Sequence, residues 1–357
     1  MVISKDKYMN IKSIFTTLLL MLSGAVSFAQ QTAQGDSPEN GKPKMAVVEL
    51  STVYMRQSPD YESPLETQEL MGTVVEIVGS SGYWREIVSP QPYKAWCTDK
   101  GIVPMSEQEI QDYEKAPKLM FTGLYGHIYS SKSTCSQTIC DLVGGDILRL
   151  GGDVSHKWIE VVTPSGKKGY VQKELLKEFS GFRSLQWSKN RDELPEYQSF
   201  ISDKDKERII GSAMQLLGVP YLWGGMSPKG VDCSGLVRWA CLMNGILLPR
   251  NASQQVFCGK EIPVDADPAY WDEDARGNQA AFKEEMQRRI SKLKRGDLLF
   301  FGTPATAEKG RRITHVGIYT GNGKMIHSSH LVRVNSLVPD EADYYENAHR
   351  LLAAVRL

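Results

Sequence analysis

Residues 221–239 have the sequence YLWGGMSPKGVDCSGLVRW, a glycine-rich loop that ends in Cys233. Apolar residues at helical spacing follow, which predicts that Cys233 lies at a helix N-terminus. Unpaired N–H groups and the helix dipole favour an anion there, and a lowered thiol pKa makes a cysteine nucleophilic near neutral pH. A buried structural cysteine is the alternative. The glycine pair, the preceding Asp232 and two downstream histidines favour a nucleophile.

The two histidines lie in segments that alternate as strands do. His315 is in Ile313-Thr-His-Val-Gly-Ile-Tyr, and His327 follows a turn expected at Gly321-Asn-Gly323. Neighbouring antiparallel strands can place two imidazoles side by side on one face. One ring would take the thiol proton and the other would orient it. Two ordinary polar residues in a sheet are the alternative.

Composition excludes several classes of function. Lys+Arg and Asp+Glu number 42 each in 357 residues, so the chain has no overall charge that would indicate a nucleic-acid partner. Cysteine and histidine do not recur at zinc-ligand spacing, and we expect no metal and no cofactor. A monomer is expected.

The N-terminus resembles a secretory signal peptide. Three lysines precede an apolar run at residues 13–29 that ends in small residues, which predicts a signal peptide over residues 1–29 and export to the periplasm or beyond the cell. The run is too short and wrongly flanked for a stable transmembrane helix, and after cleavage we expect a soluble mature protein that is not inserted in a membrane. Residues 30–44 are polar and rich in Gly and Pro, so we expect a disordered linker.

The six cysteines have different expected roles. Cys135 and Cys140 are close enough in sequence to close a small disulfide loop, and both the bridged and the free forms remain open. Cys97, Cys241 and Cys258 are interpreted as small core hydrophobes.

Two segments, residues 45–115 and 116–178, look like copies of one unit. Trp84 of the first corresponds to Trp158 of the second, and Cys97 corresponds to Val171. Short alternating runs separated by Gly, Pro and Ser predict a small all-β barrel in each copy. The strand order resembles that of bacterial SH3-like domains.

After a connector at residues 179–200 the pattern changes. An amphipathic helix is expected over residues 203–217, then the Cys233 helix, a short surface helix over 279–290, and a run of strands. Helices followed by antiparallel strands predict an α+β domain over residues 201–357 with the cysteine helix packed on a sheet.

Six motifs mark the C-terminal segment: Tyr221-Leu-Trp-Gly-Gly, Val231-Asp-Cys-Ser-Gly-Leu, Pro249-Arg-Asn-Ala-Ser-Gln-Gln, Arg295-Gly-Asp-Leu-Leu-Phe-Phe, Ile313-Thr-His-Val-Gly-Ile-Tyr and Met325-Ile-His-Ser-Ser. In these motifs, residues 201–357 resemble the NlpC-type family of bacterial cell-wall cysteine peptidases, which have a papain-like fold. The resemblance covers the whole C-terminal segment. With the paired β units upstream, the chain is similar in architecture to γ-D-glutamyl-L-diamino acid endopeptidases of the dipeptidyl-peptidase VI type.

The resemblance implies a catalytic set and a substrate pocket. Cys233 would be the nucleophile, His315 the general base and His327 the residue that orients it. The Cys233 N–H and the Tyr221 hydroxyl would hold the oxyanion. The remaining implied residues bind substrate: Asp232 at the α-ammonium, Trp223, Ser234 and Ser253 around γ-linked D-Glu, and Tyr93 with Glu66 at the free amine of L-Ala.

The implied substrates are peptidoglycan stem peptides, L-Ala-γ-D-Glu-diamino acid, cut between D-Glu and the diamino acid. Two alternatives stay open: an endopeptidase that cuts intact cross-linked wall, and a non-catalytic wall-binding protein. Residues 265–290 are an insertion relative to the family, and we expect an inert surface elaboration rather than a lid.

Overall fold

The computed structural model describes residues 44–190, 201–264, 270, 279–305 and 308–357. The described residues all belong to one compact unit. The predicted signal peptide, nearly all of the predicted linker, the second half of the connector and most of residues 265–278 lie outside the described residues. In the described ranges, no helix has the length and apolar character that a membrane span requires.

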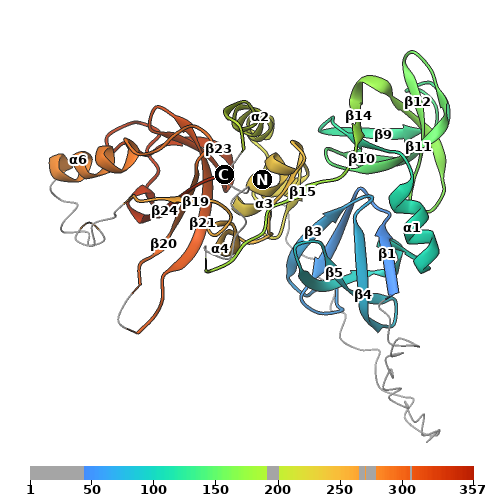
Figure 1. The fold of residues 1–357 in the computed structure, drawn as a ribbon, viewed down its shortest axis with the longest axis horizontal. Helices are drawn as coiled ribbons and strands as arrows, with labels where there is room; N and C mark the ends of the chain where they lie inside the picture. The colour runs from blue at the N-terminus through green and yellow to red at the C-terminus, as the bar shows by residue number, and fades with distance from the viewer. Residues whose placement is uncertain (1–43, 191–200, 265–269, 271–278, 306–307) are drawn as a thin grey trace, which may run out of the picture. The chain divides into compact units, whose positions relative to one another are not determined.

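Two seven-stranded sheets occupy the N-terminal half (Figure 1). Their strand orders, β3-β2-β6-β5-β4-β1-β7 and β10-β9-β13-β12-β11-β8-β14, are the same when each strand is matched to its counterpart. The strands of the first sheet are β1 (Lys44–Val48), β2 (Thr52–Arg56), β3 (Leu65–Leu70), β4 (Val74–Ser81), β5 (Trp84–Ser89), β6 (Tyr93–Thr98) and β7 (Ile102–Met105). Those of the second are β8 (Lys118–Phe121), β9 (Tyr125–Tyr129), β10 (Thr138–Val143), β11 (Ile147–Val154), β12 (Trp158–Val162), β13 (Lys168–Gln172) and β14 (Leu176–Phe179).

The repeated units predicted from sequence agree with this shared order. Trp84 opens β5 and Trp158 opens β12, which are counterparts. Cys97 and Val171 are both buried at matching positions of β6 and β13. The SH3-like assignment and the domain boundaries remain predictions. In chain order, α1 (Glu107–Lys115) follows β7 and precedes β8. It begins at a capping box made by Ser106 and Glu109.

The C-terminal part combines helices with a six-stranded sheet of order β19-β24-β20-β21-β22-β23 (Figure 1). Its neighbouring strands are antiparallel, as the sequence predicted for the last strands. The strands are β19 (Lys260–Ile262), β20 (Leu298–Thr303), β21 (Arg312–Gly321), β22 (Lys324–Ser329), β23 (Leu331–Ser336) and β24 (Leu351–Arg356). The helices are α2 (Asp203–Met214), α3 (Cys233–Leu242), α4 (Ala252–Gln255) and α6 (Gln279–Ile290), and the short strands are β15 (Arg183–Ser184), β16 (Met226–Ser227), β17 (Gly230–Val231) and β18 (Ile246–Leu247).

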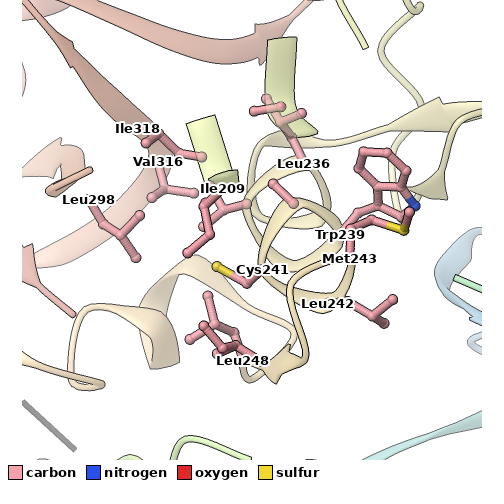
Figure 2. Close-up of a cluster of buried hydrophobic side chains, with 14 of the residues drawn as sticks. Ile209, Leu236, Trp239, Cys241, Leu242, Met243, Leu248, Leu298, Val316 and Ile318 are labelled. Carbon is pink, nitrogen blue, oxygen red and sulfur yellow. The ribbon is translucent and has the colours of Figure 1, made fainter. Parts of the chain in front are cut away.

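Helix α3 is the centre of the largest core. All ten of its residues are buried. In Figure 2, Leu236, Trp239 and Cys241 leave the helix on different sides, and Val316 of β21 lies among the surrounding side chains. Apolar side chains leave this helix on several sides, so other segments have to enclose it. The enclosure fixes where the first residue of α3, Cys233, is held.

Helix α6 confirms the predicted helix over residues 279–290. One face of it packs on the sheet, because Phe282 and Met286 are buried in a second core with Phe301 and Met325. Polar residues dominate α6, so this apolar face is narrow. The expectation that the insertion at residues 265–290 is inert rather than a lid stays a prediction.

The cysteine expectations can be compared directly. Cys97, Cys241 and Cys258 are fully buried, which confirms them as core residues. Cys135 and Cys140 are both free thiols, so of the two open alternatives the structure has the unbridged one.

Candidate active site

Cys233 is the first residue of α3, as the sequence predicted. Asp232 caps the helix: its Oδ1 accepts the Gly235 N–H at 2.7 Å, and its Oδ2 accepts the Gly224 N–H at 3.0 Å. A Cβ on Gly235 would come within 2.0 Å of the Gly225 carbonyl oxygen, so the glycine-rich loop packs directly against the first turn. Cap and contact together hold the cysteine at the helix start.

A buried arginine that the sequence analysis did not single out completes this corner. Arg250 Nη1 donates to Asp232 Oδ1 at 3.1 Å and to Ser234 Oγ at 2.9 Å, and Nη2 donates to Asp232 Oδ2. With the two N–H groups and the Ser234 hydroxyl, the Asp232 carboxylate already accepts five contacts on about four lone-pair sites. Asp232 therefore has little acceptor capacity left for a substrate ammonium. Arg250 lies in a motif quoted above, which is the signal that could have found it.

The thiol pKa differs from the expected direction. Burial raises the pKa of Cys233 to about 11, and the Asp232 carboxylate adds to the rise. The backbone N–H groups of Val316 and Ser234 act in the opposite direction but do not compensate. The expectation of a lowered thiol pKa is therefore wrong for this site without substrate, because the helix start is enclosed and carries a carboxylate beside the sulfur.

The predicted pairing of the two histidines is confirmed. His315 Nε2 lies 2.8 Å from His327 Nδ1, and His327 Nε2 lies 2.9 Å from Asn335 Oδ1. Asn335 Nδ2 donates to the Asp343 carbonyl at 2.7 Å, so its Oδ1 must accept. His327 therefore carries its proton on Nε2, and His315 donates from Nε2. The free acceptor of the relay is His315 Nδ1, the atom that a general base needs.

The local sheet geometry makes this relay possible. Gly317 stands directly opposite His327, and a Cβ there would come within 3.1 Å of the His327 Cβ. Without a side chain at Gly317, the His327 ring has room to meet His315 two residues along β21. The strand register is also interrupted beside Thr314, immediately before His315. Such irregularities re-aim a side chain.

Aromatic rings enclose the histidine pair. The Tyr345 ring centroid lies 4.7 Å from that of His327 and 5.7 Å from that of His315, and Phe301 lies 5.9 Å from His315. Burial lowers the pKa of His315 to about 3 and that of His327 to about 4. Both imidazoles are thus neutral near pH 7, the form that accepts a proton.

The other predicted pocket residues fall into two groups. Burial raises the pKa of Tyr221, and the charge of Cys233 contributes next. Trp223 is 67% exposed, and Ser253 is also exposed. Ser234 instead is buried and bonded to Asp232 and Arg250, so it supports the corner from within. Their roles toward substrate remain predictions.

Strand β3 of the first sheet lies against the loop before Cys233. A Cβ on Gly224 would come within 3.0 Å of the Glu66 backbone, and Gln68 Oε1 accepts the Met226 N–H at 2.8 Å. Tyr93 donates its hydroxyl to Glu66 Oε2 at 2.5 Å. Burial raises the pKa of Tyr93 to about 12, followed by this hydrogen bond. The predicted Tyr93 and Glu66 therefore lie together at the edge of the site.

Among the described residues, no group of three His, Cys, Asp or Glu side chains is arranged to hold a metal ion. The site contains a buried thiol at the start of α3 and a neutral imidazole with a fixed tautomer. Such groups can carry out acyl transfer through a thioester.

The comparison with protein families agrees with this chemistry. Residues 218–351 match the model of the NlpC/P60 family, and the match includes Cys233, His315 and His327. This segment is an NlpC/P60 domain. It has the α+β papain-like fold expected from sequence, and the chain is a peptidase of this type.

Several known proteins are similar to the NlpC/P60 domain and its surroundings. A γ-D-glutamyl-L-lysine dipeptidyl-peptidase of Bacillus cereus is 26% identical over 77% of this chain and 70% of that protein. The bifunctional muramidase/DL-endopeptidase CwlT of Bacillus subtilis is 34% identical over 51% of this chain, which spans about half of that relative (54%). A crystal structure of an NlpC/P60 family protein from Bacillus cereus superposes with a TM-score of 0.63 at 21% identity, covering 87% of this chain and 99% of that one, and so shares the fold.

Proposed function

We propose that this protein is an exported cysteine peptidase that hydrolyses the γ-D-glutamyl–diamino acid bond of peptidoglycan stem peptides with a free N-terminal L-Ala. The observation that carries the proposal is the position of Glu66 and Tyr93 beside the NlpC/P60 site, because a carboxylate next to the nucleophile's loop suits a peptide ammonium. The apolar run at residues 13–29 supports export.

Glu66 is better placed than Asp232 for the ammonium. Its two oxygens accept from Tyr93 and Gln57, which leaves lone pairs on both. Asp232 is saturated by Arg250 and its helix cap, so its role is to hold Arg250 and the start of α3. An ammonium at Glu66 would fix the distance from the peptide N-terminus to Cys233 and so select one scissile bond.

In the proposed reaction His315 acts first as a base, then as an acid and then again as a base. Cys233 Sγ attacks the γ-carbonyl carbon of D-Glu while its proton passes to His315 Nδ1. The Cys233 N–H and the Tyr221 hydroxyl stabilise the oxyanion. His315 then returns the proton to the leaving amine, and water hydrolyses the thioester with His315 again as the base.

The raised pKa of Cys233 fits a thiol that loses its proton during the attack rather than beforehand. His327 and Asn335 keep Nε2 of His315 in the donor form throughout, so the same nitrogen, Nδ1, handles every proton.

The test is digestion of L-Ala-γ-D-Glu-diaminopimelate and its N-acetylated form, followed by mass spectrometry. We expect release of L-Ala-D-Glu from the free peptide only, no product with Cys233→Ala, and a raised KM with Glu66→Gln. The matched control is Glu62→Gln, an exposed acid in the turn before β3. Equal cleavage of both peptides would instead favour the endopeptidase that cuts cross-linked wall, and no cleavage would favour a wall-binding protein.

A further inference from the structure

Arg333 lies on β23 directly beside the histidine relay. The antiparallel register pairs His327 with Arg333, so the two side chains leave the sheet on the same face. Val332 and Val334, the neighbours of Arg333, pack instead with the core around α3 on the other face. Arg333 is only partly buried, which leaves its guanidinium within reach of a ligand.

Arg333 has no acidic partner in the part of the chain that the structure describes, and its Nε is buried without a hydrogen-bond partner. Most arginines of the same domain do form ion pairs, namely Arg208, Arg238, Arg250, Arg288, Arg289, Arg295, Arg311 and Arg356. A half-buried cation with unmet donors is well suited to a carboxylate, which a guanidinium can bind through two parallel hydrogen bonds.

The position is close to where the leaving group must stand. His315 protonates the leaving amine in the proposed reaction, so that amine has to lie beside its ring. The charge of Arg333 lowers the pKa of both His315 and His327, after the larger effect of burial, so the guanidinium is within electrostatic reach of that place. A diamino acid carries carboxylates near its amine: one on its own α-carbon and, in diaminopimelate, another at the end of its side chain.

We propose that Arg333 binds a carboxylate of the leaving diamino acid and thereby selects substrates that carry one beside the scissile bond. The proposal rests on the proposed function, since it concerns the same cleft. It also has an electrostatic consequence. A bound carboxylate offsets the charge of Arg333, so the imidazolium of His315 forms more easily once substrate is in place.

Four tripeptides distinguish the possible carboxylates. All four begin with L-Ala-γ-D-Glu. The lysine pair ends in L-Lys with a free α-carboxylate or in L-Lys amide. The diaminopimelate pair ends in diaminopimelate amidated only at its α-carboxyl, which keeps the distal carboxylate, or amidated at both carboxyls. Wild-type enzyme should cleave an acid with a kcat/KM about tenfold to a hundredfold above that of its fully amidated partner, mainly through KM. Preference in the lysine pair would assign the α-carboxylate, and preference in the diaminopimelate pair would assign the distal one.

The variants Arg333→Gln and Arg333→Lys complete the test. Arg333→Gln should lower cleavage of the preferred acid to the rate of its amide, leave the amides unchanged, and raise the pKa of the acid limb of kcat/KM. Arg333→Lys should keep part of the preference. Cleavage of the amides serves as the measure that each variant is folded.

Two results would overturn the proposal, and they differ. If wild-type enzyme cleaves acids and amides alike, or Arg333→Gln slows all four peptides by one factor, Arg333 has no role in carboxylate recognition while the proposed function stands. If wild-type enzyme cleaves none of the four although iodoacetamide alkylates Cys233, the proposed function fails as well.

Discussion

The hydrogen bonds around His315 fix a direction for proton transfer. Asn335 can only accept at Oδ1, which sets the tautomer of His327 and, through it, that of His315. A base whose tautomer is set in advance does not have to rearrange during the reaction. Asn335 does not touch the reacting proton. It acts through His327 and His315, and is therefore a positioning residue.

The first prediction concerns Asn335. Asn335→Leu should lower kcat by about tenfold to a hundredfold with little change in KM, because the relay loses its acceptor and His315 its fixed tautomer. Asn335→Asp keeps the acceptor and adds a negative charge, so it should retain more activity and raise the pKa of the acid limb. Steady-state kinetics from acid to neutral pH check both. Equal losses in the two variants would show that Asn335 matters only for packing.

The second prediction concerns pH. Because burial lowers the pKa of His315 to about 3, the base stays neutral well below the ordinary histidine value, and kcat/KM should remain level down to about pH 5. Because burial raises the pKa of Cys233 to about 11, alkylation of the free enzyme by iodoacetamide should keep accelerating above pH 8. A plateau of alkylation at neutral pH would reveal a preformed thiolate–imidazolium pair and contradict this account.

For individual site residues, the sequence predicted which residues come together but not how deeply they are buried. The placement of Cys233 at a helix start and the contact of His315 with His327 followed from periodicity alone. The thiol pKa did not, since it depends on burial by distant segments. Asn335 was missed because residues 331–336, which form β23, were not predicted as a strand, so no sheet face was assigned to Asn335.

The start of α3 and the glycine-rich loop behave as one element. Gly235 faces the Gly225 carbonyl at a distance that admits no side chain, whereas Gly211 in α2 faces open space. The two positions therefore differ in whether they have room for a side chain. One permits a contact, and the other only lowers helix propensity.

The third prediction uses that contrast. Gly235→Ala should destabilise the protein by about 1–3 kcal/mol and lower kcat, because the loop must move away from the oxyanion position. Gly211→Ala should stabilise it by up to about 1 kcal/mol and leave kcat unchanged. Denaturant unfolding and steady-state kinetics give both values. A neutral Gly235→Ala would mean that the loop yields freely.

Helices and strands were predicted correctly where one apolar face gives the sequence a clear period. The helix of residues 203–217 was expected and α2 covers Asp203–Met214, while the expected strands correspond to β20, β21, β22 and β24. The packing of α6 on the sheet was not predicted, because only two apolar side chains of this largely polar helix, Phe282 and Met286, are buried. Patterns of periodicity do not report such sparse contacts.

In the whole molecule, three consecutive residues of β3 reach the C-terminal part. Thr67 accepts from Arg250 at 2.8 Å, Gln68 accepts from the Met226 N–H, and Glu69 pairs with Arg238 at 3.4 Å. All three are buried. The first sheet is thus joined to the peptidase domain by polar contacts that water does not reach, and unfolding one should expose the other.

The fourth prediction follows from these contacts. Calorimetry should show one cooperative transition, and Gln68→Leu should shift all of it downward by a few degrees, because the Met226 N–H is left buried without a partner. Gln108→Leu, an exposed position on α1, is the control and should change little. Two separate transitions, of which only one moves, would show that the sheet and the peptidase domain are independent.

The order of these parts along the chain has a consequence for biosynthesis. A ribosome completes β3, which borders the cleft, long before it reaches Cys233, and His315 and His327 come later still. Every prematurely terminated chain that contains the nucleophile but ends before β21 lacks the base. During translation, therefore, no growing chain carries both the thiol and its base while still lacking β3.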